Sequence, residues 1–203
     1  MISTCILTKD DATSIRLVIE SVQSVSTEIL IFDDHSIDET ASIAVGAGAT
    51  VYSLSDSIED LGFAETANRL MSKASEEWIF IIDSDELLAD PHLLPTLTRY
   101  PEKEVWALPR RKWLHYPIER TEYEAYPDWQ VRFFRNKPEN RFEGKMHVRL
   151  KNSNVYYAFM GPHIEHLQEQ FRTPHKTIQR QALYARLAFQ QGVAIKGGDV
   201  LEK

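Results

Sequence analysis

Acidic side chains gather directly after an apolar segment in the stretch EEWIFIIDSDELL, residues 76–88. Asp83, Asp85 and Glu86 follow residues that have the composition of a buried strand. Carboxylates this close repel one another and raise one another's pKa unless a cation lies between them. An Asp-x-Asp pair suits Mg²⁺ or Mn²⁺, which bind few protein carboxylates and complete their shell with water and ligand phosphate. The stretch therefore predicts a divalent-metal site, with a solvated acidic loop as the alternative.

A second acidic pair, Asp33 and Asp34, follows the apolar residues 28–32. One of these carboxylates could accept hydrogen bonds from a base or a ribose, while the other holds the loop. Residues 36–39 (SIDE) have the form of a capping box, so we expect a helix to begin near Ile37. Because Asp, Ser and Thr also favour turns for conformational reasons, a plain turn is an equal alternative for this segment alone.

The two acidic pairs need elements that bring them together. The first hundred residues alternate between strand and helix patterns in a βαβαβ order, which implies a mostly parallel sheet covered by helices on both faces. Ligands of such sheets bind beyond the carboxyl ends of the strands, so both pairs should face one crevice. The expected strands are residues 2–7, 28–32, 50–52 and 78–82, and the expected helices begin near residues 15, 37 and 63.

The pattern changes after Leu108. Residues 109–135 are rich in aromatic residues and arginine, and residues 129–135 and 154–159 alternate partly like strands. This half therefore predicts a mixed or antiparallel extension of the sheet. A helix is expected over residues 173–191, with an apolar stripe formed by Ile178, Ala182, Ala185 and Phe189.

The composition excludes several classes of protein. The 203 residues are 43% hydrophobic and 26% charged, enough for one domain with a sizeable core, and the net charge of −7 argues against non-specific binding of nucleic acid. The single cysteine, Cys5, excludes an internal disulfide and fits a reducing compartment. We see no signal-peptide pattern and no apolar stretch of the ~20 residues that span a bilayer. We expect a cytoplasmic protein, with peripheral contact at a membrane left open.

Four segments together resemble a known family. DDHSIDET (residues 33–40) is similar to the DDGSTDGT element of family 2 glycosyltransferases with the GT-A fold. Residues 63–88 resemble that family's FA…N…A…W…DADE stretch, in a subset that includes lipopolysaccharide-core glucosyltransferase-like enzymes. PDWQVRFFRN (127–136) and FEGKMH (142–147) resemble its PD-Q-RLFR and G-x-H-E segments. The resemblance covers about residues 1–170 and is specific as a combination, although no single segment is.

The resemblance implies roles for individual residues. Thr8 and Asp34 should contact the nucleotide base, and Asn68 should lie beside the base or the ribose. Asp85 should bind the metal that bridges the diphosphate, and Asp83 should lie near the ribose or the donor sugar. The expected nucleotide- and donor-binding residues of the first half are Thr8, Asp33, Asp34, Asn68 and Asp83.

The second half supplies further candidates. Arg132 and Arg135 could balance a leaving diphosphate, because a guanidinium fork suits phosphate, or they could be the solvated face of a strand. His147 could approach the metal or the leaving group. The metal ligands expected are Asp85, Asp83 and His147. The residue that deprotonates the acceptor is unassigned, and the candidates are Glu86, Asp128 and Glu143.

Three positions depart from the family pattern. His35 replaces the usual Gly after the acidic pair, so that loop must adopt a conformation that histidine tolerates. Ala67 stands where relatives carry Arg, and Val148 stands where relatives often carry Glu after the histidine. These departures leave a weakened or non-catalytic protein open.

Histidine and aromatic residues have structural alternatives. His163 and His166 form an H-x-x-H sequence, but without a Cys or a third nearby His we interpret it as structural and not as a zinc site. Several aromatic residues could line a sugar site, although packing accounts for most of them: Trp106, Trp113, Tyr116, Tyr123, Tyr126 and Trp129.

The family resemblance and the acidic pairs together predict a GT-A-like, Mn²⁺- or Mg²⁺-dependent, hexosyltransferase-like enzyme. It would transfer a sugar from a nucleotide-diphosphate donor, preferably a UDP-sugar, to a saccharide or another hydroxyl acceptor, with inversion. We expect residues 1–108 to bind the donor and residues 109–203 to form the acceptor side of one continuous domain. The alternatives are a nucleotidyltransferase, which the lack of a glycine-rich loop after the first strand disfavours, a receiver domain, and a non-catalytic sugar-nucleotide binder.

Overall fold

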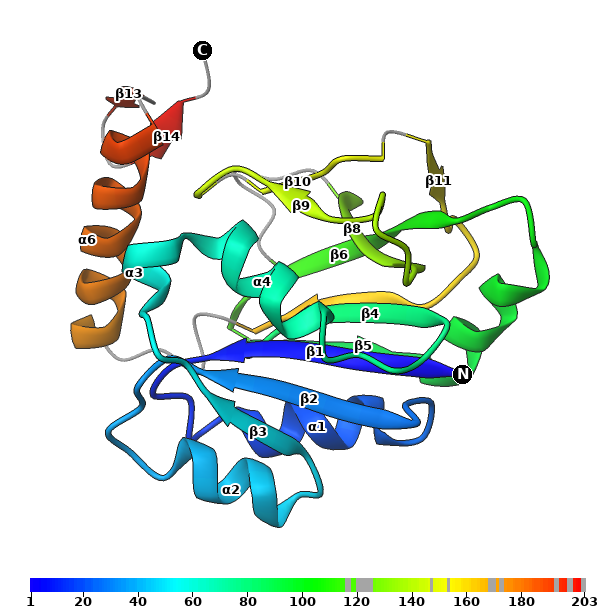
Figure 1. Ribbon diagram of the computed structural model, residues 1–203, viewed down its shortest axis with the longest axis horizontal. Helices are drawn as coiled ribbons and strands as arrows, with labels where there is room; N and C mark the ends of the chain where they lie inside the picture. The colour runs from blue at the N-terminus through cyan, green and yellow to red at the C-terminus, as the bar shows by residue number, and fades with distance from the viewer. Residues whose placement is uncertain are drawn as a thin grey trace.

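A single mixed sheet forms the centre of the molecule (Figure 1). The computed structural model describes residues 1–115, 118–119, 126–146, 148–152, 154–167, 171, 174–191, 194–196 and 199–201. Within these residues the strand order is β3-β2-β1-β4-β8-β6-β12-β5, and β7 and β11 also pair with β6.

The first half forms the parallel part of the sheet. β1 (Ile2–Thr8) lies between β2 (Glu28–Asp33) and β4 (Trp78–Asp83), and β3 (Thr50–Ser53) pairs with the outer side of β2. These are the strands that the sequence predicts. The register places Thr8 opposite Asp33 and Leu7 opposite Asp83, so the carboxyl ends of three strands meet at one edge.

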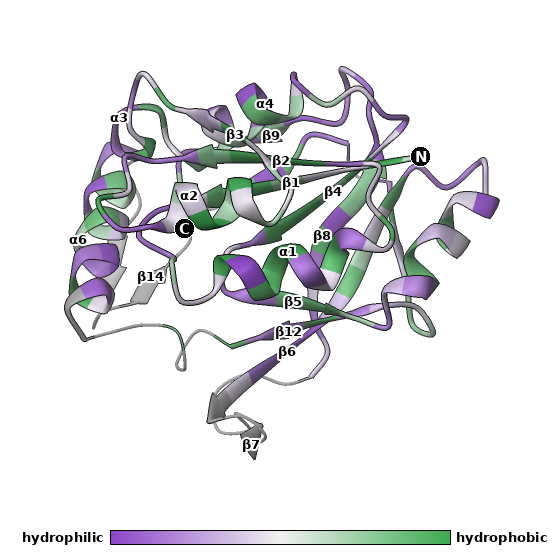
Figure 2. Cartoon of the chain, turned by 90° about the horizontal axis from the view of Figure 1, so that it is seen from below, coloured by the Kyte–Doolittle hydropathy of each residue, from purple (hydrophilic) through white to green (hydrophobic). Residues whose placement is uncertain are grey.

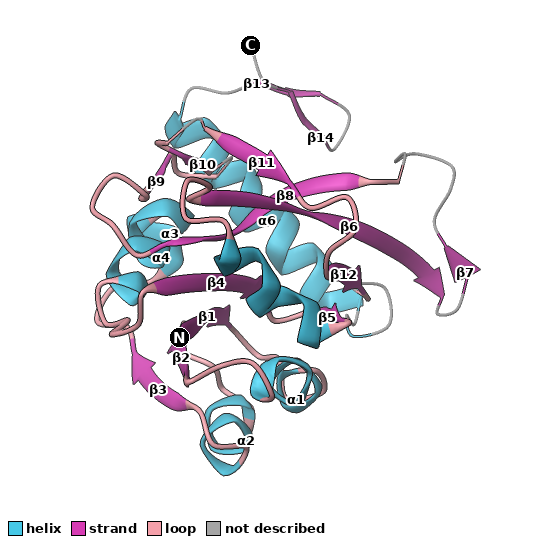
Figure 3. Ribbon diagram, turned by 90° about the vertical axis from the view of Figure 1, so that its right-hand side faces the viewer, coloured by secondary structure: helices cyan, strands magenta, loops and turns pink. Residues whose placement is uncertain are grey.

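Helices cover both faces of this part, as the βαβ pattern predicts. α1 (Ile15–Gln23) and α2 (Thr40–Gly46) lie on one face, and α4 (Phe63–Met71) lies on the other, after the short α3 (Ile58–Leu61) (Figures 1 and 3). Two layers of apolar side chains separate the helices from the sheet. The apolar residues run along β1, β2 and α1 in Figure 2. Cys5 is buried in the α4 layer, where burial raises the pKa of its thiol to about 12 and keeps it inert.

The predicted helix start near Ile37 is wrong. α2 begins at Thr40, and Ser36 accepts a hydrogen bond from the Asp10 amide (2.8 Å) and caps no helix. The capping box that does form is Ser57 with Asp60, at the start of α3. The first loop therefore uses its polar residues to join the ends of β1 and β2.

The second half extends the same sheet with both antiparallel and parallel pairs, as the predicted mixed extension requires. β8 (Asp128–Arg135) lies between β4 and β6 (Val105–His115), antiparallel to both. β12 (His163–His166) pairs with β6 and with β5 (Glu86–Ala89), which begins directly after the acidic turn. The remaining elements are η1 (Pro91–Arg99), β7 (Ile118–Glu119), β9 (Phe142–Glu143), β10 (Arg149–Leu150), β11 (Val155–Tyr157), β13 (Ala194–Lys196) and β14 (Asp199–Leu201).

α6 (Pro174–Gln191) confirms the predicted C-terminal helix but presents a different face to the protein. Ile178 and Phe189, from the predicted apolar stripe, are 65% and 84% exposed. Leu187 and Ala188 are buried instead, against Met146. Among the described residues, no helix has the length and hydropathy needed to cross a bilayer.

His35 has the left-handed backbone conformation that its replacement of glycine suggests. Its φ is 58°, and the side chain is exposed. A residue with a Cβ atom is strained there, although histidine tolerates the region better than most residues.

His35→Gly is expected to raise the free energy of unfolding by about 1 kcal/mol, because glycine reaches this conformation without the conflict of a Cβ atom. His35→Ala keeps the Cβ atom, so it serves as the control and should bring no gain. Urea unfolding of the three proteins measures the difference. Equal stability of the two variants would contradict the strain.

Candidate functional site

Polar contacts join the carboxyl ends of β1, β2 and β4. The Lys9 ammonium lies 3.1 Å from the Asp34 carboxylate, which also accepts a hydrogen bond from the Ile58 amide. Asp11 accepts hydrogen bonds from the hydroxyls of Thr8 (2.8 Å) and Ser84 (2.6 Å). The loops after all three strands are therefore fixed to one another at the edge where the sequence predicts a crevice.

Asp85 lies between a histidine and an arginine from the second half. Its side chain is buried, with Oδ1 3.5 Å from His166 Nε2 and Oδ2 3.8 Å from Arg180 Nη1. The Asp85 carbonyl accepts a hydrogen bond from the Leu167 amide at 3.0 Å, which fixes the acidic turn against the end of β12. Asp85 is thus the carboxylate of the Asp-x-Asp pair that faces an imidazole.

The other acidic residues belong to a chain of ion pairs that crosses β8 and β6. Arg132 Nη2 lies 2.7 Å from Asp83 and 2.9 Å from Glu86. Arg110 binds Glu86 at 3.0 Å and Asp128 at 2.5 Å. Glu86 is 0% exposed and also accepts a hydrogen bond from the Asp83 amide. The positive charge that the acidic stretch requires is therefore supplied in part by the protein's own arginines.

Two arginines lower the pKa of Asp83 and of Asp128, although burial of these carboxyl groups would raise it. Burial alone would raise the pKa of Asp83 and of Asp128. The charge and hydrogen bonds of Arg132 outweigh burial at Asp83 and lower its pKa, and Arg110 does the same at Asp128. Both carboxylates are thus held ionised, and Asp128 is a weak base for that reason.

The structure places several predicted site residues outside this cluster. Arg135 lies opposite Trp78, at the amino end of β4, and pairs with Glu77. Its predicted contact with a diphosphate stays a prediction that this arrangement does not support, because the strand β4 separates it from the acidic turn. His147 lies outside the described residues, so its predicted role stays a prediction.

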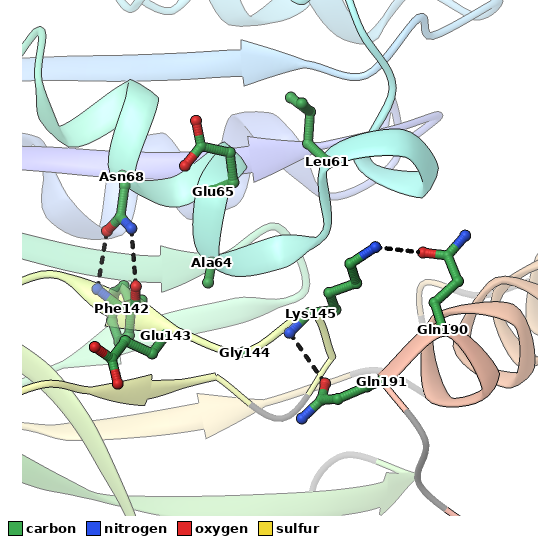
Figure 4. Close-up of a pocket in the computed structure, with 10 residues that line it drawn as sticks. All are labelled: Leu61, Ala64, Glu65, Asn68, Phe142, Glu143, Gly144, Lys145, Gln190 and Gln191. Atoms are coloured by element: carbon green, nitrogen blue, oxygen red, sulfur yellow. Dashed lines mark hydrogen bonds between the residues drawn. The ribbon is translucent and has the colours of Figure 1, made fainter.

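Asn68 and Glu143 line a separate cavity of about 510 Å³ between α4, β9 and the end of α6 (Figure 4). The Asn68 amide bonds both ways with the backbone of Phe142, at 2.9 Å each, and so attaches β9 to α4. The Glu143 side chain is mostly exposed and lies 3.9 Å from the Lys151 ammonium. Neither residue touches the acidic cluster, so the predicted roles of Asn68 at the nucleotide and of Glu143 as a base lose their structural support.

Sequence reasoning missed several members of the cluster. His166 was interpreted as structural, yet it is the imidazole beside Asp85. Arg110 and Lys112 have the alternating spacing that places both on one face of β6, and Lys112 lies 3.6 Å from Asp128. The i, i+4 spacing of Lys176 and Arg180 was the signal for two inward cations on α6.

Two solved structures share the overall fold of this chain. Glucosyl-3-phosphoglycerate synthase from Mycobacterium tuberculosis, crystallised with Mn²⁺, UDP and glucosyl-3-phosphoglycerate, is 18% identical over 97% of this chain and 82% of its own, with a TM-score of 0.59. S. aureus TarS is 14% identical over 95% of this chain and 40% of its own, with a TM-score of 0.59. These likenesses confirm the predicted fold.

The chain belongs to the family described as Glycosyl transferase family 2, whose model matches residues 3–188. A TPR repeat-containing protein of Synechococcus elongatus is 28% identical over 75% of this chain and 36% of its own length. An uncharacterized glycosyltransferase of Rickettsia conorii is 33% identical over 43% of this chain and 30% of its own length. The predicted family is thus confirmed, and the chain spans about a third of the length of these relatives.

The role of Glu86 can be tested by removing its charge. Glu86→Gln leaves two buried guanidinium groups without their shared partner, so we expect a loss of about 3–5 kcal/mol in the free energy of unfolding. Glu143→Gln, at an exposed carboxylate, is the control and should change stability by less than about 0.5 kcal/mol. Thermal and urea unfolding measure both. A stable Glu86→Gln protein that has lost only turnover would instead support the original prediction of a catalytic base.

Proposed function

We propose that this protein is a metal-dependent glycosyltransferase that transfers a sugar from a UDP-sugar to a hydroxyl acceptor, with inversion. The observation that carries the proposal is the pairing of Asp85 with His166 at the carboxyl end of β4, in a chain of this family and fold. Its placement among lipopolysaccharide-core glucosyltransferase-like enzymes, its cytoplasmic location and the division into a donor half (1–108) and an acceptor half (109–203) are parts of the same proposal.

The residues around Asp85 fit a divalent cation that keeps open positions. Asp85 and His166 offer one carboxylate and one imidazole, and the described residues contain no group of three or more metal-binding side chains. Two protein ligands leave positions for phosphate oxygens and water, as Mn²⁺ and Mg²⁺ require in nucleotide sites. Arg132 holds Asp83, and His166 offers an imidazole of the kind that we expected from His147, whose own role stays a prediction. A bound cation would neutralise charge on the departing diphosphate.

The nucleotide would lie across the ends of β1 and β2. Asp33 Oδ1 is a buried acceptor without a hydrogen-bond partner among the described residues, and a base or ribose donor would satisfy it. Lys9 and the Ile58 amide hold the Asp34 carboxylate, which fixes the loop after β2. The same carboxylate would accept a hydrogen bond from the nucleotide base. The Thr8 hydroxyl donates a hydrogen bond to Asp11, in the loop that follows β1.

Asp128 is the remaining candidate for deprotonating the acceptor, although its pKa is lowered because Arg110 outweighs burial, which makes it a weak base. It is partly exposed at the start of β8, whereas Glu86 is fully buried. In the proposed step, the acceptor hydroxyl gives its proton to this carboxylate, the oxygen bonds to the anomeric carbon, and the diphosphate leaves with the electrons of the broken bond. Arg110 and Gln130 hold the carboxylate in place, while Arg132 positions Asp83 and Glu86.

A non-catalytic binder of sugar nucleotides is the second candidate function. Ala67 is buried in the apolar layer beneath α4, so the arginine found there in relatives has no counterpart in this crevice. Val148 is 37% exposed, so the missing glutamate is not replaced by a core residue. Hydrolysis of a UDP-sugar by the protein with Mn²⁺ distinguishes an enzyme from a binder.

Asp85→Ala is expected to abolish the Mn²⁺-dependent part of UDP binding and to leave the fold intact, because the alanine removes one of the two proposed metal ligands. Calorimetry with UDP, in the presence and absence of Mn²⁺, measures the loss. Asp90→Ala, an acidic residue exposed beyond β5, is the matched control. An unchanged affinity in Asp85→Ala would remove Asp85 from the metal site.

Asp34→Ala is expected to weaken binding of uridine alone as well as of UDP, with and without Mn²⁺. The reason is that Asp34 ends a different strand from the acidic turn and acts on the base side. Calorimetry with uridine gives the signature. If only the Mn²⁺-dependent affinity falls, Asp34 belongs to the cation site instead.

A further inference from the structure

α6 has one face that is cationic near its amino end and apolar near its carboxyl end. Near its amino end, Lys176 binds Asp11 and the Asp10 carbonyl, and one turn later Arg180 approaches Asp85. Near its carboxyl end, Leu187 packs against Met146. Figure 1 shows this helix standing beside the carboxyl ends of β1 and β2. The apolar end fixes the helix on the protein, and the cationic end reaches the acidic loops.

The guanidinium group of Arg180 contacts Tyr184 through one nitrogen and faces Asp85 with another. Its Nε donates a hydrogen bond to the Tyr184 hydroxyl at 2.7 Å, and its guanidinium carbon lies 5.1 Å from the centre of the Tyr184 ring. Its Nη1 lies 3.8 Å from Asp85 Oδ2, at the edge of ion-pair distance. The tyrosine therefore fixes the stem of the side chain while the outer nitrogens face the carboxylate that we assign to the metal.

A cation bound to Asp85 would repel the guanidinium group that now faces it. Arg180 would then need another anion within its reach. A diphosphate bridging that cation offers oxygens beside Asp85, and a guanidinium fork is suited to binding them in pairs. His166 can stay beside Asp85 as a neutral ligand.

We propose that Arg180 exchanges Asp85 for the donor's diphosphate when the divalent cation binds, so that cation and nucleotide diphosphate bind with positive coupling through α6. This inference rests on the proposed function. A cation without diphosphate displaces Arg180 from Asp85 and gives it no new anion in exchange, so the cation binds weakly. When both ligands are present the exchange is complete, and the coupling acts equally on the two affinities.

The test is Arg180→Met, which keeps the length of the side chain and removes its charge. Calorimetry is performed with Mn²⁺ alone, with UDP alone, and with UDP at saturating Mn²⁺. Affinity for Mn²⁺ alone should rise, about fivefold, because a competing cation is gone. Affinity for UDP with Mn²⁺ should fall about tenfold or more, as expected for the loss of charge-assisted hydrogen bonds. Arg186→Met, on the same helix at the exposed Glu59 pair, is the control and should change neither.

Opposite signs for the two affinities distinguish the exchange from a structural role. If both affinities fall together, or neither changes, the proposal is overturned. If the unsubstituted protein binds neither Mn²⁺ nor UDP, the proposed function fails instead. Should Arg180→Met not fold, Arg180→Lys keeps the charge without the planar fork. It should bind Mn²⁺ alone as the unsubstituted protein does and UDP more weakly, and unchanged UDP affinity would overturn the exchange.

Discussion

The buried carboxylate of Glu86, held by two guanidinium groups, is the interaction on which the rest of the site depends. Glu86 begins β5, while Arg132 and Arg110 come from β8 and β6. A carboxylate with no exposure is unfavourable unless it is paired and hydrogen-bonded, so the acidic turn of the first half needs strands of the second half beside it. The antiparallel extension thus completes the sheet and also neutralises the turn that carries Asp85.

The parts of the fold that follow from local periodicity could be predicted from the sequence. Apolar runs separated by helical spacing identified β1 to β4, and the polar residues that end them located the crevice. The partners of the carboxylates could not be predicted, because they depend on register between distant segments. Arg110 meets Asp128 only because the β6–β8 pairing places the two residues directly opposite each other.

Two further segments show where periodicity is insufficient. On α6, hydropathy selects the stripe of Ile178 and Phe189, but ion pairs of Lys176 and Arg180 turn the opposite face inward. Whether the two histidines of H-x-x-H lie on one face depends on whether they are in a helix or in a strand. Residues three apart share a face of a helix but point to opposite faces of a strand, and the histidines lie in β12. Of these two histidines, His166 is therefore the one that reaches Asp85.

The matching of charges also constrains which ligands the crevice accepts. Five of its carboxylates already face a cation of the chain: Asp34 with Lys9, Asp11 with Lys176, Asp83 with Arg132, Asp85 with Arg180, and Asp128 with Arg110. A lone cation or a lone anion would disturb this balance, because buried or half-buried charges are poorly screened. A divalent cation together with a diphosphate adds little net charge while giving each displaced group a new partner. A metal–nucleotide pair therefore fits the crevice better than either ion, which favours a nucleotide-diphosphate donor over an acidic loop that serves only the fold.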